Sequence, residues 1–138
     1  MPDIDRRSAL AIGFAGLSGL VLPGQAAAQP YGPNQGKELT QGVRQVDLGE
    51  RESMIPAYKK VRLRDIVLQP GAKLPANAMM NDMLCHLTEG ELAVVQNDKV
   101  FTAKKGDVWT CAKDITREGS ENKGNTVAIM RVIDLLTA

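Results

Sequence analysis

The residues best suited to chemistry are concentrated at positions 79–86, which read MMNDMLCH. This stretch holds three of the chain's six methionines, one of its two cysteines and its only histidine. Thiolate and thioether sulfurs bind soft metal ions such as Cu(I), paired cysteines form disulfides, and methionine also fills irregular space in an apolar core. The residue types therefore predict a soft-metal site, a disulfide or a sulfur-rich core, and they leave all three interpretations open.

Residues 1–28 predict a signal peptide. Arg6 and Arg7 precede a Gly-rich apolar run that is too short to span a bilayer as a mature helix. Three alanines at 26–28 supply the small residues of a cleavage site, so we expect cleavage after Ala28. The paired arginines resemble a twin-arginine signal, whose pathway exports folded proteins. The mature chain, residues 29–138, is expected to be periplasmic or secreted, with an ordinary secretory signal or a membrane anchor as the alternative.

The charge pattern excludes two classes of partner. The chain has 17 Lys and Arg residues against 16 Asp and Glu residues, a net charge of +1, and the two signs are interspersed. Nucleic acids and anionic membranes select clustered positive charge, which this chain lacks. No second apolar run follows the signal, so we expect no stable membrane insertion after its removal. A small molecule remains the expected partner.

Alternation of apolar and charged residues predicts an all-β domain over residues 43–138. Strands are expected at 43–48, 58–68, 83–89, 91–96, 100–103, 108–111 and 126–136, with turns at Gly, Asn and Asp residues between them. Residues 29–42 are expected to form an irregular N-terminal arm, and 69–77 and 113–125 to form loops. No segment has a helical period, so the pattern indicates a β-sandwich or barrel.

Two glycine-framed patterns in this domain resemble the motifs of the cupin superfamily. The motif G-x5-H-x-H-x3-E-x6-G fits from Gly71 to Gly90 without a gap, and the motif G-x5-P-x-G-x2-H-x3-N begins at Gly106. The resemblance extends from about Val61 to Ile133. It implies a double-stranded β-helix, a barrel of the jelly-roll type. Because cupins commonly pair through their sheets, it also implies a homodimer.

The metal-binding positions of this resemblance carry no metal ligands. The two histidines and the glutamate of the first motif correspond to Asn77, Met79 and Met83, and the histidine of the second corresponds to Arg117. Imidazole and carboxylate groups suit the divalent ions that cupins hold, and an arginine adds a permanent positive charge beside any cation. We predict that this chain lacks the superfamily's usual metal and the chemistry that depends on it.

The resemblance also orients the sulfur-containing strand. If Met83 faces the barrel interior, as its motif position implies, Cys85 faces inward with it and His86 points outward, because strand side chains alternate. Cys111 lies in the second motif, which converges on the same interior. A disulfide between Cys85 and Cys111 would contribute about 3 kcal/mol. The other alternative to a plain core is a Cu(I) site formed by the sulfur atoms of Met79, Met83, Cys85 and Cys111.

We predict a cupin-type barrel that binds a small organic ligand, and an arginine among the expected contacts would suit a ligand with an anionic group. Its expected contacts are Asn77, Met79, Met83, Cys85 and Arg117, with Arg117 holding a carboxylate or phosphate by two hydrogen bonds. The polar segment 113–125 is expected to border the opening, with Lys113, Asp114, Arg117 and Glu118 facing the ligand. An enzyme that uses copper or the cysteine pair is the alternative, and whether the protein is an enzyme stays open.

Overall fold

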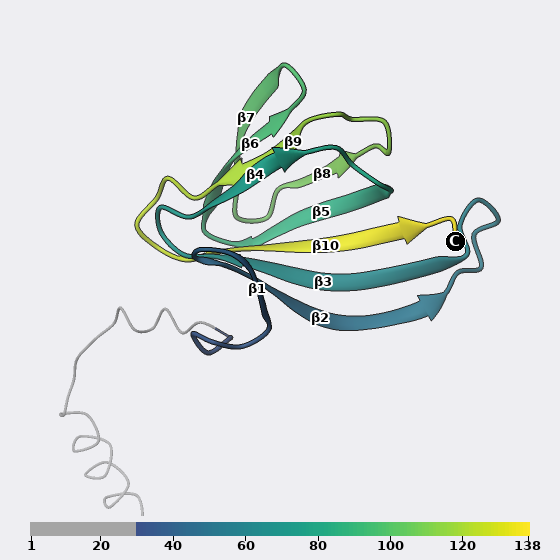
Figure 1. Cartoon of the computed structure of the whole chain (residues 1–138), viewed down its shortest axis with the longest axis horizontal. Helices are drawn as coiled ribbons and strands as arrows, with labels where there is room; N and C mark the ends of the chain where they lie inside the picture. The colour runs from purple at the N-terminus through teal and green to yellow at the C-terminus, as the bar shows by residue number, and fades with distance from the viewer. Residues whose placement is uncertain (1–29) are drawn as a thin grey trace, which may run out of the picture. The chain divides into compact units, whose positions relative to one another are not determined.

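The computed structural model describes residues 30–138, so the predicted signal peptide lies outside the described residues. Residues 30–138 contain no helix, and therefore none that is long and apolar enough to cross a membrane. They form ten strands (Figure 1): β1 (Lys37–Thr40), β2 (Val43–Glu52), β3 (Lys60–Leu68), β4 (Lys73–Asn77), β5 (Asp82–Glu89), β6 (Glu91–Gln96), β7 (Lys99–Lys104), β8 (Val108–Cys111), β9 (Glu118–Glu121) and β10 (Ala128–Leu136).

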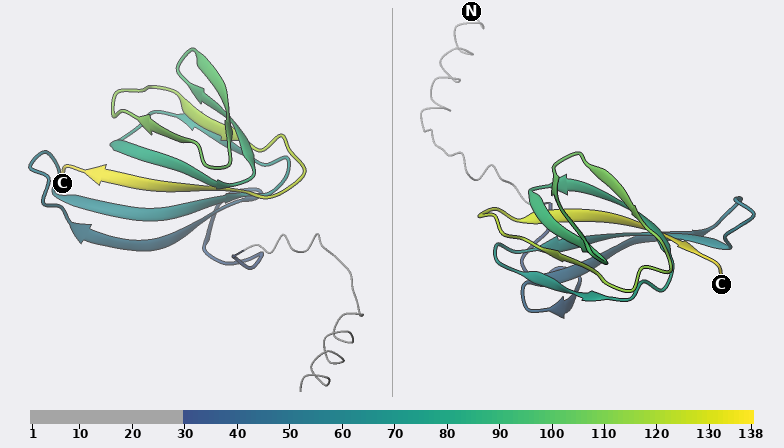
Figure 2. Two further views of the ribbon diagram at one scale, coloured as in Figure 1. Left: turned by 180° about the vertical axis from the view of Figure 1, so that it is seen from behind. Right: turned by 90° about the horizontal axis from the view of Figure 1, so that it is seen from above.

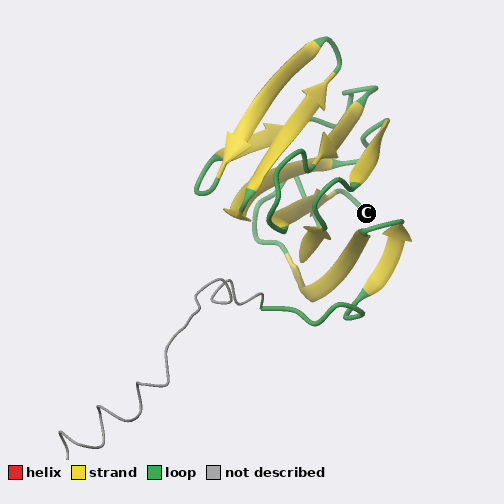
Figure 3. Cartoon of the chain, turned by 90° about the vertical axis from the view of Figure 1, so that its left-hand side faces the viewer, coloured by secondary structure: helices red, strands yellow, loops and turns green. Residues whose placement is uncertain are grey.

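The strands form two antiparallel sheets that face each other. The larger sheet has six strands in the order β1-β2-β3-β10-β5-β8, and the smaller has four in the order β4-β9-β6-β7. Figure 3 shows the strands of the two sheets from the side of the domain. Neighbours such as β3 and β10 are distant in sequence, as expected for a jelly-roll barrel. The all-β prediction is therefore confirmed.

Alternation along the strands places the core between the sheets. In β10, Ala128, Met130 and Val132 are buried on one face, and they pair directly with Leu68, Ile66 and Arg64 of β3. The core continues through both sheets with Val43, Cys85, Leu87, Leu92, Val94, Ala103 and Cys111. Successive side chains of a strand point to opposite faces, so each strand contributes every second residue to this interior.

Three strands lie in segments predicted to be irregular. β1 falls in the predicted arm, β4 in the predicted loop 69–77, and β9 in the predicted loop 113–125. These three predictions are wrong. β4 and β9 are short and polar, and each obtains part of its hydrogen bonding from the other. Neither strand is long enough to show a clear apolar alternation, and no residue of β4 is buried.

Two glycines of the first motif occupy backbone conformations that favour glycine. Gly71 has a φ of 84° and Gly90 a φ of 77°, a region that other residues rarely adopt. Gly90 is also crowded, because a Cβ there would lie 2.7 Å from the carbonyl oxygen of Val127. Space around Gly71 is open. The glycine framework read from the sequence therefore has a physical basis in the turns before β4 and between β5 and β6.

The end of the domain at which the chain terminates carries a projecting hairpin. Residues 53–59 connect β2 to β3, and Figure 2 shows this connection extending beyond the smaller sheet. The amide of Ser53 donates to the Lys59 carbonyl at 2.9 Å, and the amide of Lys59 donates to the Leu136 carbonyl at 2.7 Å. Met54, at its tip, is 98% exposed. This hairpin contributes nothing to the space between the sheets.

Candidate functional site

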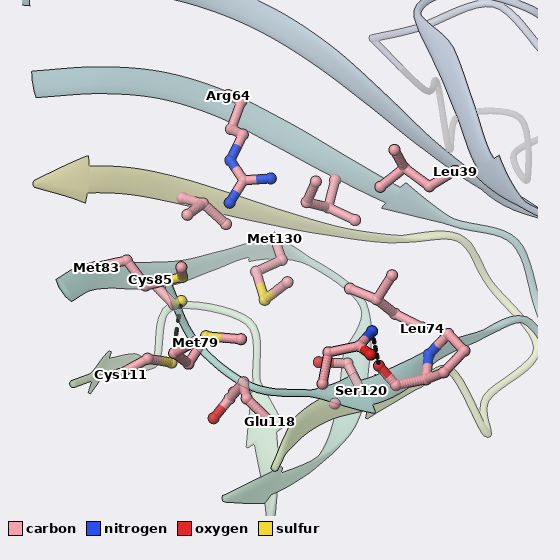
Figure 4. Close-up of a pocket in the computed structure, with 15 residues that line it drawn as sticks. Leu39, Arg64, Leu74, Met79, Met83, Cys85, Cys111, Glu118, Ser120 and Met130 are labelled. Atoms are coloured by element: carbon pink, nitrogen blue, oxygen red, sulfur yellow. Dashed lines mark hydrogen bonds between the residues drawn. The ribbon is translucent and has the colours of Figure 1, made fainter. Parts of the chain in front are cut away.

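A cavity of about 180 Å³ lies between the two sheets. Strands of both sheets contribute to its wall, which is mostly apolar and unusually rich in sulfur (Figure 4). Its lining consists of Leu39, Arg64, Ile66, Leu74, Pro75, Asn77, Met79, Met83, Cys85, Cys111, Glu118, Gly119, Ser120, Met130 and Val132.

Five sulfur atoms belong to this wall, and the two cysteines are in contact. The Sγ atoms of Cys85 and Cys111 lie 3.9 Å apart, and both cysteines are buried and free. Cys111 pairs across β5 and β8 with Met83, and Cys85 pairs with Trp109, so the cysteines are diagonal neighbours on the inner face. A disulfide has an S–S distance of about 2.05 Å. The structure therefore brings the predicted cysteine pair together as thiols, without the disulfide.

The surroundings of Cys111 oppose its ionisation. The hydrogen bond with Cys85, burial and the negative charge of Glu118 raise the pKa of Cys111 above its ordinary value. Gln96 donates from Nε2 to the Cys111 sulfur at 3.4 Å and to the Thr110 carbonyl at 2.8 Å, and the first of these bonds acts in the opposite direction because it stabilises a negative sulfur. On balance the thiol form of Cys111, a weak nucleophile, is favoured.

Glu118 is the acidic group of the cavity. Burial raises the pKa of its carboxyl group, and hydrogen bonds from Cys111 and Gln96 offset part of this effect. Its Oε1 atom is buried and has no hydrogen-bond partner among residues 30–138. A carboxyl group in this position takes up a proton more readily than one in water and can then donate a hydrogen bond into the cavity.

Arg64 is the basic group of the cavity, and a buried carboxylate fixes it. Its Nε and Nη2 atoms donate to the two oxygens of Asp134 at 2.8 and 3.0 Å, and its Nη1 donates to Gln45 at 2.9 Å. Asp134 is fully buried and also accepts from Arg62 and Asn81. Figure 4 shows the guanidinium group of Arg64 extending from β3 toward Met130. The arginine is therefore held rigidly at the cavity wall.

The structure brings four of the five predicted contact residues to one cavity: Asn77, Met79, Met83 and Cys85 all line it. His86 does not line it, as the alternation of β5 predicts. Of the polar residues expected to border the opening, Glu118 lines it, whereas Lys113 and Asp114 do not.

Arg117 is the one predicted contact residue that does not line the cavity. It lines a separate depression with Ala93, Val95 and Val100 of the smaller sheet, and its Nη1 donates to the Asn97 carbonyl at 3.3 Å. Arg117 directly precedes β9, whose first residue Glu118 faces the cavity, and adjacent side chains of an extended chain point to opposite faces. The prediction that Arg117 anchors a ligand in the barrel is wrong.

Arg64, Ser120 and Met130 are among the cavity residues that the sequence did not point to. Arg64 stands in VRLRDIVL, where charged residues alternate with apolar ones as they do on an exposed strand face. The available signal was parity with Ile66, which is buried and lies two residues further along the same face. Ser120 and Met130 carried no distinguishing pattern.

The domain is similar to solved structures of one superfamily. A cupin domain of Cnp3 from Schizosaccharomyces pombe superposes with a TM-score of 0.58 at 18% identity, covering 72% of this chain and 69% of that one. A predicted oxalate decarboxylase from Thermotoga maritima gives 0.57 at 22% identity, with 68% and 80% covered. The chain has a cupin fold. A cupin-superfamily sugar phosphate isomerase from Silicibacter pomeroyi gives 0.56 at 24% identity, with 70% and 61% covered. No protein-family model and no curated protein matches the chain.

The residues at the cupin metal positions do not fit the metals that cupins hold. The motif resemblance assigns Asn77, Met79 and Met83 to three of those positions, and these residues line the cavity with an amide and two thioethers. It assigns Arg117 to the fourth, and Arg117 lies outside the cavity. No group of three or more His, Cys, Asp or Glu side chains suited to a metal occurs among residues 30–138. Hard and borderline divalent ions prefer oxygen and imidazole ligands, so this donor set does not suit them.

Proposed function

We propose that this cupin barrel binds a small organic ligand with an anionic group, and that Arg64 is its anchor. The observation that carries the proposal is a guanidinium group fixed at the wall of a mostly apolar cavity. Binding sites typically combine apolar walls with a few polar groups that set the ligand's orientation. Arginine suits carboxylate and phosphate groups because its planar fork donates two parallel hydrogen bonds.

Arg64 has hydrogen-bonding capacity to spare. A guanidinium group carries five N–H donors, and three of those in Arg64 are used by Asp134 and Gln45. The remaining donors belong to Nη1 and Nη2, the two atoms best placed for a bidentate contact. Arg62 also donates to Asp134, so two positive charges share one buried negative charge. This local excess of positive charge favours an anion.

The cavity volume limits the size of the ligand. About 180 Å³ slightly exceeds the roughly 150 Å³ of an engineered cavity that accepts benzene. It is smaller than the roughly 300–1,000 Å³ of sites for drug-sized ligands. A ligand of about six to ten non-hydrogen atoms therefore fits. A small aromatic or branched aliphatic carboxylate combines this size with the apolar wall and the guanidinium group.

Export and assembly belong to the same proposal. The signal-like residues 1–28 support a periplasmic or secreted protein that meets its ligand outside the cytoplasm. The cupin fold supports a homodimer. A thiol-dependent enzyme has weaker support, because the surroundings of Cys111 raise the pKa of its thiol.

Titration calorimetry with two isosteric probes tests the proposal. Benzoate and benzamide have the same shape, but only benzoate is charged, so we expect benzoate to bind at least about tenfold more tightly. Arg64→Gln should abolish this preference. Arg117→Gln is the matched control, since its side chain lies outside the cavity, and it should bind benzoate as the unaltered protein does. Equal binding of the two probes, or loss of binding in the Arg117 variant alone, would refute the assignment of Arg64.

A further inference from the structure

We propose that Cys85 and Cys111 together bind one Cu(I) ion at the sulfur-rich end of the cavity, with a methionine sulfur as the third ligand. Figure 4 shows the side chains of Met79, Met83, Cys85 and Cys111 gathered at this end, away from Leu74 and Ser120. The site goes beyond the organic ligand and does not depend on it. The copper ligands are sulfur atoms, whereas the organic ligand is assigned to Arg64.

The distance between the two thiols fits a shared ion. A metal–thiolate bond of about 2.3 Å to each of two sulfurs 3.9 Å apart gives an S–metal–S angle of about 116°. That angle is close to the ideal of a trigonal site, so one ion can be held by both sulfurs without moving the strands. Met83 lies directly opposite Cys111 in the β5–β8 pairing. Met79 is fixed by its amide hydrogen bond to the Ile115 carbonyl at 2.9 Å.

The donor set selects a soft ion. Thiolate and thioether ligands favour Cu(I), while zinc sites use four ligands drawn from thiolate, imidazole and carboxylate groups. Among residues 30–138 no third His, Cys, Asp or Glu joins the two cysteines in such a group. Methionine is the only further donor type that both lines the cavity and carries a soft atom. Copper in its lower oxidation state fits this combination best.

The protons and charges of the step balance without an oxidant. Copper enters as Cu(I), each thiol loses its proton as its sulfur binds the metal, and two protons leave for solvent. The two thiolates and the ion carry a net charge of −1. The hydrogen bond that Gln96 donates to the Cys111 sulfur stabilises this charge, in the manner of outer-shell partners at metal sites. Arg64 supplies positive charge from the cavity wall.

Anaerobic competition between the fully reduced protein and a chromophoric Cu(I) chelator tests the site. We expect one copper per chain and release of two protons, with sulfur as the only neighbour of copper in X-ray absorption. Cys85→Ser and Cys111→Ser should each weaken binding at least about a hundredfold, a loss of about 2.7 kcal/mol. Circular dichroism of each variant establishes that it is folded.

Methionine and histidine variants separate this site from adventitious copper. Met79→Leu or Met83→Leu should weaken binding about tenfold or more. Met80→Leu is the matched control, because Met80 adjoins Met79 but is 82% exposed. His86→Ala is the second control, and neither control should change the affinity. Copper that stays bound in folded Cys111→Ser, or that fails to bind the reduced protein, overturns the proposal. Either result would overturn the copper site alone, because benzoate binding at Arg64 is measured by calorimetry in the absence of metal.

Discussion

Asp134→Asn tests the buried charge network that fixes Arg64. The carboxylate of Asp134 is fully buried, and it accepts hydrogen bonds from Arg62, Arg64 and Asn81. The asparagine has nearly the same shape but no charge. It therefore leaves two arginines facing each other without the carboxylate between them, while the packing of β10 changes little.

The expected cost follows from how well each arginine can reach water. Breaking a buried ion pair by removing one partner typically costs about 3–5 kcal/mol. The side chain of Arg62 is 38% exposed and can turn to solvent, whereas that of Arg64 is 18% exposed and largely cannot. We therefore expect the lower end, a decrease of about 3 kcal/mol in the free energy of unfolding at pH 7.

The difference should depend on pH. Burial raises the pKa of Asp134, but the hydrogen bonds and charge of Arg64, with those of Asn81 and Arg62, lower it by more, so the net pKa lies below its ordinary value. A carboxyl group with a lowered folded pKa stabilises the protein above its unfolded pKa of about 3.9 and loses this contribution as the pH falls further. The gap between the two proteins should be constant from about pH 5 to 7 and shrink below about pH 4.

Urea denaturation at several pH values measures both effects. With a slope of about 2 kcal/mol per molar urea, a loss of 3 kcal/mol moves the midpoint down by about 1.5 M. Asp47→Asn is the matched control, because Asp47 is exposed and pairs only with Gln45 at the same sheet, and it should change stability by less than about 0.5 kcal/mol. A loss below about 1 kcal/mol for Asp134→Asn, or a gap at pH 3 as large as that at pH 7, would refute the reasoning.

Two further stability predictions follow from single positions. Gly90→Ala should lower the free energy of unfolding, measured by urea denaturation, by at least about 1 kcal/mol more than Gly71→Ala does. Both glycines have a positive φ, but only at Gly90 would a Cβ clash, with Val127. Equal losses of stability would contradict the crowding at Gly90. Asn122→Ala should lower the free energy of unfolding by about 2 kcal/mol or more, since the fully buried amide donates hydrogen bonds to the Leu68 and Thr126 carbonyls. A thermal midpoint within about 2 °C of that of the unaltered protein would contradict this prediction.

The fold was predictable because its signals are local. Strands such as β6 and β10 carry their alternation in their own residues, and Gly71, Gly90 and Gly106 mark turns that need positive φ. β4 and β9 were not predictable in the same way. Both strands are short, and their pairing joins residues such as Lys73 and Glu121 that are far apart in the chain. Such long-range pairing leaves no pattern within a short window of sequence.

The candidate site was predictable only where a motif fixed the register. The motif placed Asn77, Met79 and Met83 at the barrel interior, and alternation then added Cys85. Arg64 could not be found this way, because its partner Asp134 lies 70 residues away in the chain. Without that partner a charged residue on an alternating strand is expected to face water. The second motif instead points to Arg117, which has the right chemistry but lies just before β9 with its side chain outside the cavity.

Methionine-methyl NMR tests the central claim, a ligand site between the two sheets, most directly. Met79, Met83 and Met130 line the cavity, whereas Met54 and Met80 are 98% and 82% exposed, so the protein carries its own internal controls. On titration with benzoate we predict saturable shifts for the three cavity methyl groups and none for the two exposed ones. Saturation of all methyl groups alike, or no shift at any of the cavity positions with any small carboxylate, would contradict a binding site in this barrel.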